Sequence, residues 1–275
     1  MTMGIASQLV PTSLGSLNVR VTGAGPAALL WHGMFVDGTS WERVAPRLAA
    51  CRTLVILDGP AHGCSDPLTS TASLSDCAAV AVELLDALRI AGPVDWVGNA
   101  WGGHVGMVTA LQHPERIRSL VAVSAPPSPI SQSLRRRITL LRPLLSTIGY
   151  RGPLLGAVLA SQLTAASADD PATRELAVAS FRRPRRDGIA RAIRSFILNR
   201  EDLMGSLPDL APPTLFIATD DRGEFTPDDA AKAAGAAQRG DWAVARGARA
   251  LVPLEQPGWL AREILDFWER GADRA

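Results

Sequence analysis

A tight, glycine-lined turn joins a short apolar stretch to a helical one near the middle of the chain. Residues 94–97 are followed by the turn Gly98-Asn99-Ala100-Trp101-Gly102-Gly103, and a helical pattern then continues to about Gln112. Glycine is favoured where one backbone segment passes close to another, so this turn predicts that a strand and a helix meet at a sharp, crowded angle. A unit of this kind requires a sheet with helices packed on it.

Apolar runs of strand length alternate with helical patterns on both sides of this turn. Because continuous apolar strands separated by helices are typical of parallel sheets covered on both faces, we predict an α/β fold with a mostly parallel central sheet flanked by helices. The predicted elements are a hairpin over 8–13 and 17–22, strands over 27–31, 53–57, 117–123, 214–218 and 242–245, and helices over 40–49, 73–90, 228–237 and 258–270.

The segment 127–206 interrupts this alternation with helical stretches broken by proline and glycine. It holds 13 Arg against 6 Asp and Glu, although the whole chain has a net charge of only +1. We therefore predict a core over residues 1–126 and 207–275 and an inserted helical cap over 127–206. Guanidinium groups lining such a cap would favour a carboxylate, phosphate or thioester-carrier substrate, and the alternative is that they form solvated helix faces.

Composition limits the other classes of function. No apolar run approaches the length of a membrane span, so no stable membrane insertion is expected, and the first residues lack a basic, then apolar, leader pattern, which favours a cytoplasmic protein. The three cysteines have no metal-ligand spacing and favour reduced thiols, with no metal and no cofactor expected. No nucleic-acid-binding motif is present, so a small-molecule substrate or ligand is the expected partner. The oligomeric state of the protein stays open.

Six motifs in fixed order carry a resemblance to a known family. In this order and at these spacings they resemble the α/β-hydrolase superfamily, of the capped serine-hydrolase type, over nearly the whole chain. The resemblance implies an α/β-hydrolase fold with an inserted helical cap. The motifs are Trp31-His32-Gly33-Met34, residues 58–66 (Asp-Gly-Pro-Ala-His-Gly-Cys-Ser-Asp), the turn at 98–103, His113-Pro114-Glu115-Arg116-Ile117, Pro213-Thr214-Leu215-Phe216-Ile217 and Pro253-Leu254-Glu255-Gln256-Pro257.

The resemblance also implies catalytic positions, two of which hold alanine. Ala100 stands where relatives carry the nucleophilic serine, and counting back from the Glu-Gln-Pro motif puts Ala250 where they carry histidine. Asp221 stands in the position of the acid, with Asp220 as the alternative. The backbone N–H groups of Met34 and Trp101 are expected to form the oxyanion hole.

Five further residues are expected near the substrate. His104 follows the turn by one helical turn, and the cap offers arginines for an anionic group. For His32, as for His62, hydrogen bonding within the loops is the alternative to substrate contact. The predicted substrate-binding residues are His32, Gly33, Asn99, His104 and Arg142.

Two classes of function remain open at this point. In the first, the parent activity is hydrolysis of an ester, thioester, lactone or activated carbon–carbon bond in a small substrate, with an anionic substrate as one version. The chain as given, which lacks the serine and the histidine, is then expected to be hydrolytically inactive. The turn is similar to that of hydrolases acting on meta-cleavage products. In the second, the chain is a natural non-hydrolytic member, either a ligand-binding pseudoenzyme or a cyclase or lyase that acts by positioning its substrate. Natural loss and engineered replacement of the two side chains both fit.

Overall fold

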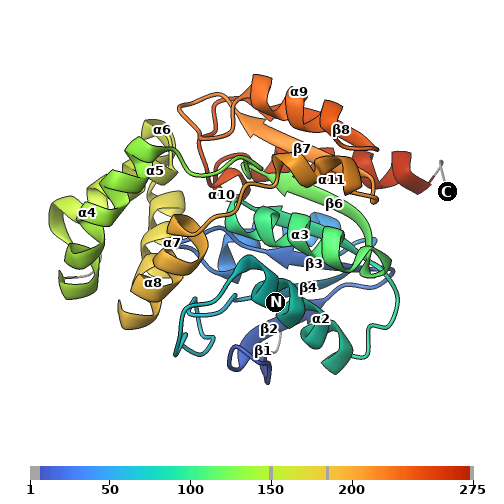
Figure 1. The fold of residues 1–275 in the computed structure, drawn as a ribbon, viewed down its shortest axis with the longest axis horizontal. Helices are drawn as coiled ribbons and strands as arrows, with labels where there is room; N and C mark the ends of the chain where they lie inside the picture. The colour runs from blue at the N-terminus through green and yellow to red at the C-terminus, as the bar shows by residue number, and fades with distance from the viewer. Residues whose placement is uncertain (1–6, 149–150, 184–185, 273–275) are drawn as a thin grey trace.

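An eight-stranded sheet forms the centre of the protein (Figure 1). The computed structural model describes residues 7–148, 151–183 and 186–272. The strand order is β1-β2-β4-β3-β5-β6-β7-β8, and only the β1–β2 and β2–β4 pairs are antiparallel. The predicted mostly parallel sheet is therefore confirmed. The strands are β1 (Ser7–Val10), β2 (Leu17–Thr22), β3 (Ala27–Trp31), β4 (Thr53–Leu57), β5 (Val94–Asn99), β6 (Ile117–Val123), β7 (Thr214–Thr219) and β8 (Gly240–Ala245).

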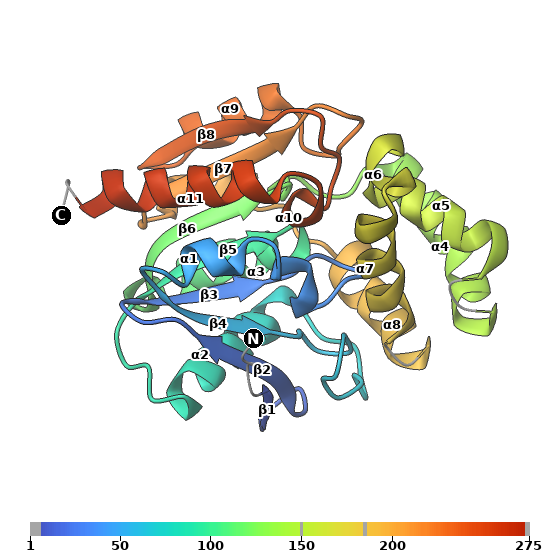
Figure 2. The ribbon, with the colours of Figure 1, turned by 180° about the vertical axis from the view of Figure 1, so that it is seen from behind.

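Helices cover both faces of the sheet (Figures 1 and 2). One face carries α2 (Leu74–Ala87), α3 (Trp101–Gln112) and α9 (Pro227–Ala236), and the other carries α1 (Ala45–Leu48) and α11 (Pro257–Ala272). Strands β5 and β7 are buried along their whole length, as expected for strands packed on two sides. Two hydrophobic cores result, one on each face of the sheet.

The predicted helix over 40–49 is wrong in its extent. The structure has a 3₁₀ turn η1 (Gly38–Trp41), begun by Asp37, whose side chain accepts the N–H of Thr39, and then the short helix α1. Pro46 lacks the N–H that a continuous helix would need at this point, so the first segment ends before it and a new one begins with Pro46 in its first turn. By contrast, the start of α2 agrees with the prediction, because Ser73 and Asp76 form a capping box.

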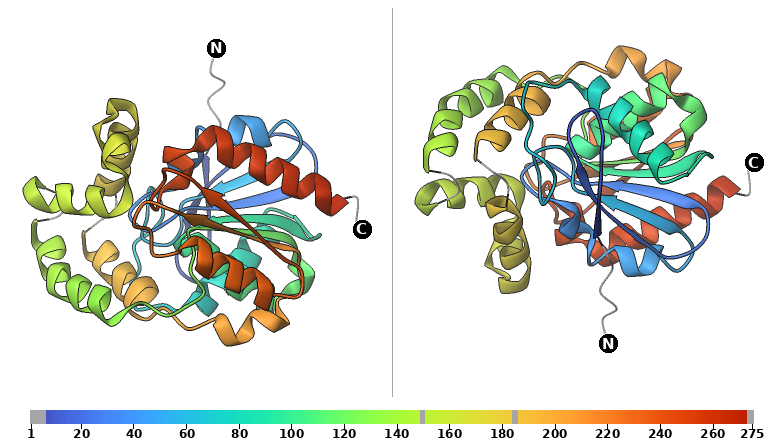
Figure 3. Two further views of the ribbon diagram at one scale, coloured as in Figure 1. Left: turned by 90° about the horizontal axis from the view of Figure 1, so that it is seen from above. Right: turned by 90° about the horizontal axis from the view of Figure 1, so that it is seen from below.

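A separate group of helices lies beyond the carboxyl ends of the parallel strands (Figures 1 and 3). We call residues 132–198 the cap helices; the division of the chain at 127 and 206 stays a prediction. No helix in the described ranges is long and apolar enough to cross a membrane. The cap helices are α4 (Gln132–Ile148), α5 (Gly152–Gln162), α6 (Ala165–Asp169), α7 (Pro171–Arg182), α8 (Arg186–Ala192) and the π-helical segment η3 (Ile193–Leu198); shorter helices are η2 (Pro114–Arg116), η4 (Met204–Asp209) and α10 (Val252–Glu255).

Candidate functional site

The turn between β5 and α3 holds Ala100 in an unfavourable backbone conformation. Its φ is 47° and its ψ is −108°, in a region that residues with a Cβ atom avoid. The N–H of Ala100 donates to the carbonyl of Val123 on the neighbouring strand at 2.7 Å, and its carbonyl accepts the N–H groups of Gly103 and His104. The surrounding hydrogen bonds therefore hold the strained turn in place.

A cavity of about 440 Å³ opens above this turn, and Ala100 and Ala250 both line it. Its volume is within the usual range for a small-molecule site. The core side of the wall also includes Met34, Trp101 and His104. The cap side is mostly apolar, with Leu134, Ile138, Leu154, Ala157, Val158, Ile193, Phe196 and Ile197.

The buried side chain of Asn99 brings the loop with Ala250 to the turn. Its Nδ2 atom donates to the carbonyl of Ala250 at 2.9 Å and to that of Val123 at 3.2 Å. From the other side, the carbonyl of Gln162 in α5 accepts the N–H groups of Ala250 and Leu251, at 3.2 and 3.3 Å. The loop is thus fixed between the core and a cap helix, with the carbonyl of Ala250 held by Asn99, the chain neighbour of Ala100.

Both candidate acids lie beside the loop that carries Ala250. The carboxylate of Asp221 accepts a hydrogen bond from Nη2 of Arg249 at 3.0 Å, and the N–H of Asp221 donates to the carbonyl of Ala248. Asp220 is more exposed, and its carboxylate accepts the N–H of Gly247 at 2.7 Å. Both carboxylates therefore bind the segment just before Ala250, and the choice of Asp221 over Asp220 stays a prediction.

Two backbone N–H groups at the cavity have no acceptor. Met34 and Trp101 line the cavity, and within the described part of the chain neither backbone N–H donates a hydrogen bond. The indole ring of Trp101 stacks on Phe196 of η3, with ring centroids 4.6 Å apart, so the start of α3 is packed against the cap. Their role as an oxyanion hole for a bound carbonyl compound stays a prediction.

Of the histidines predicted near the substrate, only His104 lines the cavity. Burial, and then the charge of Arg200, lower the pKa of His104 to about 3, so its imidazole is neutral at pH 7. Its Nε2 atom lies 2.9 Å from the carbonyl of Pro126, which can only accept, so this nitrogen carries the proton and Nδ1 is left as an acceptor.

The structure places His32, predicted to contact substrate, in hydrogen bonds to two loops. The side chain is fully buried outside the cavity wall, with Nδ1 donating to the carbonyl of Gly33 at 2.7 Å and Nε2 accepting the N–H of Gly59 at 2.8 Å. Burial, the largest influence, lowers the pKa of His32. Both nitrogens of the neutral ring are used by the backbone, so His32 fixes the shape of two loops.

Three other predicted contacts have different outcomes. Gly33 and Asn99 lie outside the cavity wall, and both support the turn: a Cβ atom added to Gly33 would lie 3.0 Å from Oδ1 of Asn99 and 3.6 Å from Cβ of Ala100. Both residues were predicted to contact substrate, and in the structure they position the backbone of the turn. Arg142 belongs to α4, but its side chain lies outside the described part of the structure.

The cavity also contains residues that the sequence analysis missed. Ser124 follows β6 directly and is nine-tenths buried, with φ at +48°. Its place after a parallel strand was a usable signal, because the carboxyl ends of such strands form ligand sites. Arg200 and Glu224 form an ion pair in the wall, and nothing in the sequence distinguished Arg200 from the other arginines of the segment 127–206.

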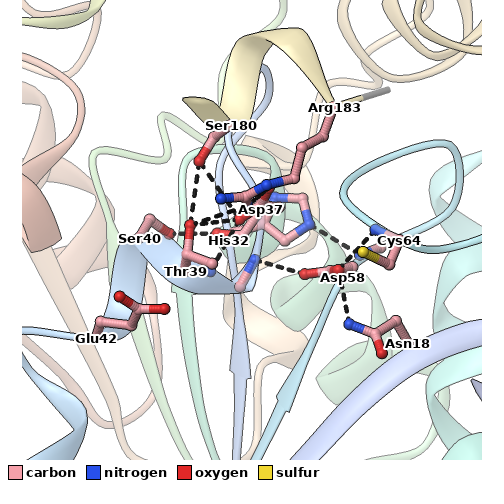
Figure 4. A network of polar contacts seen from close by, with 12 residues as sticks. Asn18, His32, Asp37, Thr39, Ser40, Glu42, Asp58, Cys64, Ser180 and Arg183 are labelled. Atoms are coloured by element: carbon pink, nitrogen blue, oxygen red, sulfur yellow. Dashed lines mark hydrogen bonds and ion pairs between the residues drawn. The ribbon is translucent and has the colours of Figure 1, made fainter. Parts of the chain in front are cut away.

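A network of polar contacts ties the loop after His32 to the cap (Figure 4). The fully buried carboxylate of Asp37 accepts hydrogen bonds from the N–H and hydroxyl of Thr39, at 2.9 and 2.6 Å, and from Arg183 at the end of α7. Burial alone would raise the pKa of Asp37, but the Thr39 hydrogen bonds and the charge of Arg183 lower it below its usual value. Asp37 is therefore ionised and joins core to cap.

The replacement Asp37→Asn is expected to lower the free energy of unfolding by about 2 kcal/mol at neutral pH, because it leaves Arg183 without its counter-charge. This is below the roughly 3–5 kcal/mol usual for a broken buried ion pair, since Arg183 is 35% exposed and water can replace part of the interaction. A carboxyl with a lowered folded pKa stabilises above its unfolded pKa, about 3.9, and this contribution disappears as the pH falls through the folded pKa. Urea unfolding at several pH values measures the effect.

The control for this prediction is Asp86→Asn, which removes an ion pair with Arg116 at a carboxylate that is 61% exposed. It is expected to cost less than about 0.5 kcal/mol. A stability difference between the native protein and Asp37→Asn that persists undiminished at about pH 2 would contradict the role given to the ionised carboxylate.

No group of three or more His, Cys, Asp or Glu side chains in the described ranges is arranged to hold a metal ion. The polar side chains of the residues that line the cavity are two hydroxyls, four arginines, one amide, one glutamate and one neutral imidazole. Such groups can bind, orient and polarise a carbonyl compound.

Comparisons with known proteins agree with this architecture. The 2-hydroxymuconate semialdehyde hydrolase of Pseudomonas sp. (strain CF600) is 32% identical over 123 residues, which cover 44% of this chain and 41% of that protein. A 2-hydroxy-6-oxononadienedioate/2-hydroxy-6-oxononatrienedioate hydrolase of Dechloromonas aromatica (strain RCB) is 29% identical over 77% of this chain and 72% of its own. The match spans about a third to a half of the length of the first curated relatives.

Solved structures of low sequence identity share the fold. An esterase from Thermogutta terrifontis has a TM-score of 0.87 at 20% identity, covering 97% of this chain and 99% of its own. The enol-lactonase of Burkholderia xenovorans LB400 also has a TM-score of 0.87, at 19% identity, covering 95% of this chain and 100% of its own. A family profile matches residues 28–263, which is most of the chain. The protein belongs to the alpha/beta hydrolase family.

Proposed function

We propose that this chain is a non-hydrolytic member of its family, which binds a small carbonyl compound in the cavity and positions it without covalent attack. One observation carries the proposal: Ala100, in the strained turn, and Ala250 line the same cavity. The family resemblance assigns these positions to the nucleophile and to the general base. Both present only methyl groups, so neither bond formation nor proton transfer can start from them.

The parts of the site that depend on the backbone support carbonyl binding. The N–H groups of Met34 and Trp101 have no acceptor in the described structure and can polarise a carbonyl oxygen. They lie on the core side of the cavity, opposite the apolar side chains of the cap helices. Binding followed by positioning alone is sufficient for a ligand-binding protein, or for a cyclase or lyase reaction within one bound molecule.

We infer the parent activity from the same features. Hydrolysis of an ester, a thioester, a lactone or an activated carbon–carbon bond requires the oxyanion N–H groups together with the two missing side chains. Relatives named as a 2-hydroxymuconate semialdehyde hydrolase and an enol-lactonase support this range of reactions. Asp221 would act as the acid and Asp220 as its alternative, since both carboxylates bind the loop that carries Ala250.

Two serine hydroxyls also line the cavity, and the proposal requires that neither replaces the missing nucleophile. The hydroxyl of Ser161 donates to the carbonyl of Val158 at 2.7 Å. In the described part of the structure, no hydrogen bond joins Ser124 or Ser161 to an imidazole, and Nε2 of His104 is used by Pro126. A serine without a base has almost no nucleophilic activity at neutral pH.

Covalent labelling tests this proposal. The unmodified protein is expected to show no mass increase after incubation with an excess of a fluorophosphonate, which reacts with activated serines, and no burst of product from p-nitrophenyl acetate. Intact-mass spectrometry measures the first and absorbance the second. A stoichiometric adduct mapped by peptide sequencing to Ser124 or Ser161 would contradict the proposal, because it would identify a different nucleophile.

A further inference from the structure

Arg200 is a buried cation in the wall of the cavity, just beyond the π-helical segment η3. Its side chain is only 5% exposed. The two terminal nitrogens bind the two carboxylate oxygens of Glu224, Nη1 to Oε2 at 3.1 Å and Nη2 to Oε1 at 3.2 Å. The Nε–H group is buried and has no hydrogen-bond acceptor in the described structure. The guanidinium therefore holds one carboxylate and has a donor left over.

The two members of this ion pair differ in how firmly they are held. Arg200 is enclosed by the protein, but the Glu224 side chain is 42% exposed. Glu224 belongs to the loop after β7, in which Arg222 has φ at +54° and is 87% exposed on its side chain. A rotation of Glu224 would move its carboxylate into solvent, where an ion is well solvated, and would leave Arg200 in need of another anion.

The charges around the cavity favour an anion as the replacement. The described residues that line it include Arg137, Arg200, Arg222 and Arg249, and Glu224 is the only acidic one among them. Asp221 balances Arg249 from outside the wall. The cavity therefore keeps an excess of positive charge. The neutral imidazole of His104 neither adds to this charge nor reduces it.

We propose that Arg200 is the binding site for a carboxylate group of the ligand, and that Glu224 occupies this site in the empty cavity and is displaced when the ligand binds. The planar fork of a guanidinium matches a carboxylate in two parallel hydrogen bonds, and Glu224 already makes this pair of contacts. Nδ1 of His104 carries no proton and cannot donate to a carboxylate, and the Nε–H of Arg200 is buried, so the two terminal nitrogens of the guanidinium would make the contact.

This inference rests on the proposed non-covalent function and narrows its ligand to one chemical class. The ligand would carry a carboxylate at Arg200, an apolar body against Ile138, Val158 and Phe196 of the cap helices, and its carbonyl near Ala100. A small oxo acid, or the half-ester of a dicarboxylic acid, has this composition. The arginines of the exposed cap faces are not required.

Binding of matched acids and amides tests the site. We would measure, by isothermal titration calorimetry at pH 7, the affinity for the straight-chain acids from butyrate to octanoate and for their primary amides, which keep the shape and lose the charge. The best acid is expected to bind at least about tenfold more tightly than its amide. If no acid in the series binds more tightly than its amide, the proposal is wrong.

Three variants separate a binding role from a structural one. Arg200→Met is expected to abolish the preference for acid over amide, and Arg200→Lys to retain part of it, since it keeps the charge and loses the fork. Glu224→Gln removes the competing carboxylate and is expected to strengthen acid binding about fivefold, with the amide affinity unchanged. If the ion pair were only structural, Arg200→Met and Glu224→Gln would both weaken the binding of acid and of amide. The control is Arg194→Met, which removes an exposed charge outside the cavity wall and should leave both affinities unchanged.

Two results would overturn the proposal even if Arg200→Met fails to fold: weaker acid binding by Glu224→Gln, or an acid-to-amide ratio in Arg200→Lys equal to that of the native protein. Failure of the proposed function gives a different signal. An active serine would appear as a fluorophosphonate adduct, and the preference for acid over amide would still be measurable in that protein.

Discussion

Replacing both alanines, Ala100→Ser together with Ala250→His, is expected to turn this protein into an esterase. We expect hydrolysis of short p-nitrophenyl esters to rise by about 10³-fold or more over the unmodified chain, while each single variant stays near the unmodified rate. In a catalytic triad, loss of the serine or of the histidine alone costs nearly as much as loss of both, so the gain should appear only in the double variant. Initial rates at saturating ester measure it.

The expected gain follows from the parts of the site that remain. The turn holds position 100 in its strained conformation, Asn99 binds the carbonyl of Ala250, and Met34 and Trp101, whose N–H groups we propose as the oxyanion hole, line the cavity. The carboxylate of Asp221 binds Arg249 through one oxygen, Oδ2. Its other oxygen, Oδ1, lies 4.0 Å from Nε of exposed Arg222, and we propose that this oxygen orients the introduced imidazole.

The acid can be tested in the same background. Adding Asp221→Asn to the double variant should remove most of the gained activity, whereas Asp220→Asn should have a smaller effect. A double variant that folds, as judged by circular dichroism and thermal unfolding, and hydrolyses esters no faster than its parent would contradict the assignment of positions 100 and 250.

Gly98→Ala is expected to lower the free energy of unfolding by about 3 kcal/mol or more, the largest effect on stability that we expect from a single added methyl group. A Cβ atom on Gly98 would lie 2.1 Å from the carbonyl oxygen of Gly102 and 2.4 Å from the nitrogen of Gly103. Both are backbone atoms of the first turn of α3, so no side-chain rotation can relieve the clash. The turn could accommodate the methyl group only by opening.

The matched control is Gly92→Ala, since a Cβ atom there would meet nothing within 4 Å. This change is expected to alter the free energy of unfolding by less than about 1 kcal/mol. Urea unfolding followed by far-UV circular dichroism measures both variants. Equal stabilities for the two would mean that the turn is less crowded than its contacts indicate, and the argument for a fixed position 100 would then fail.

Sequence patterns predicted the sheet well because its strands are encoded locally. Residues 117–123 are apolar except for Arg118 and Ser119, which is close to the pattern of a parallel strand buried on both faces, and the structure has β6 at these residues. The helix predicted over 40–49 failed because apolar spacing was given more weight than Pro46, which interrupts the hydrogen bonds of a helix.

The candidate site divides in a similar way. Positions set by the turn and by neighbouring motifs, such as Ala100, Met34 and Trp101, were predicted from sequence and line the cavity. The pairing of Arg200 with Glu224 depends on how the cap helices lie over the core, and no local pattern encodes that distance. The sequence also could not indicate which histidine would line the cavity: His104 and His32 are both buried and both bond to backbone, and only the place of His104 in the cavity wall separates them.

The central claim is that positions 100 and 250 are the empty places of a nucleophile and its base across one cavity. A crystal structure of the Ala100→Ser, Ala250→His variant tests it most directly, through the distance between the introduced serine oxygen and the nearer imidazole nitrogen. We predict about 2.6–3.2 Å, the range of a nucleophile–base hydrogen bond, with no shift of the surrounding backbone. Well-ordered side chains that point away from each other, with the cavity wall between them, would contradict the account.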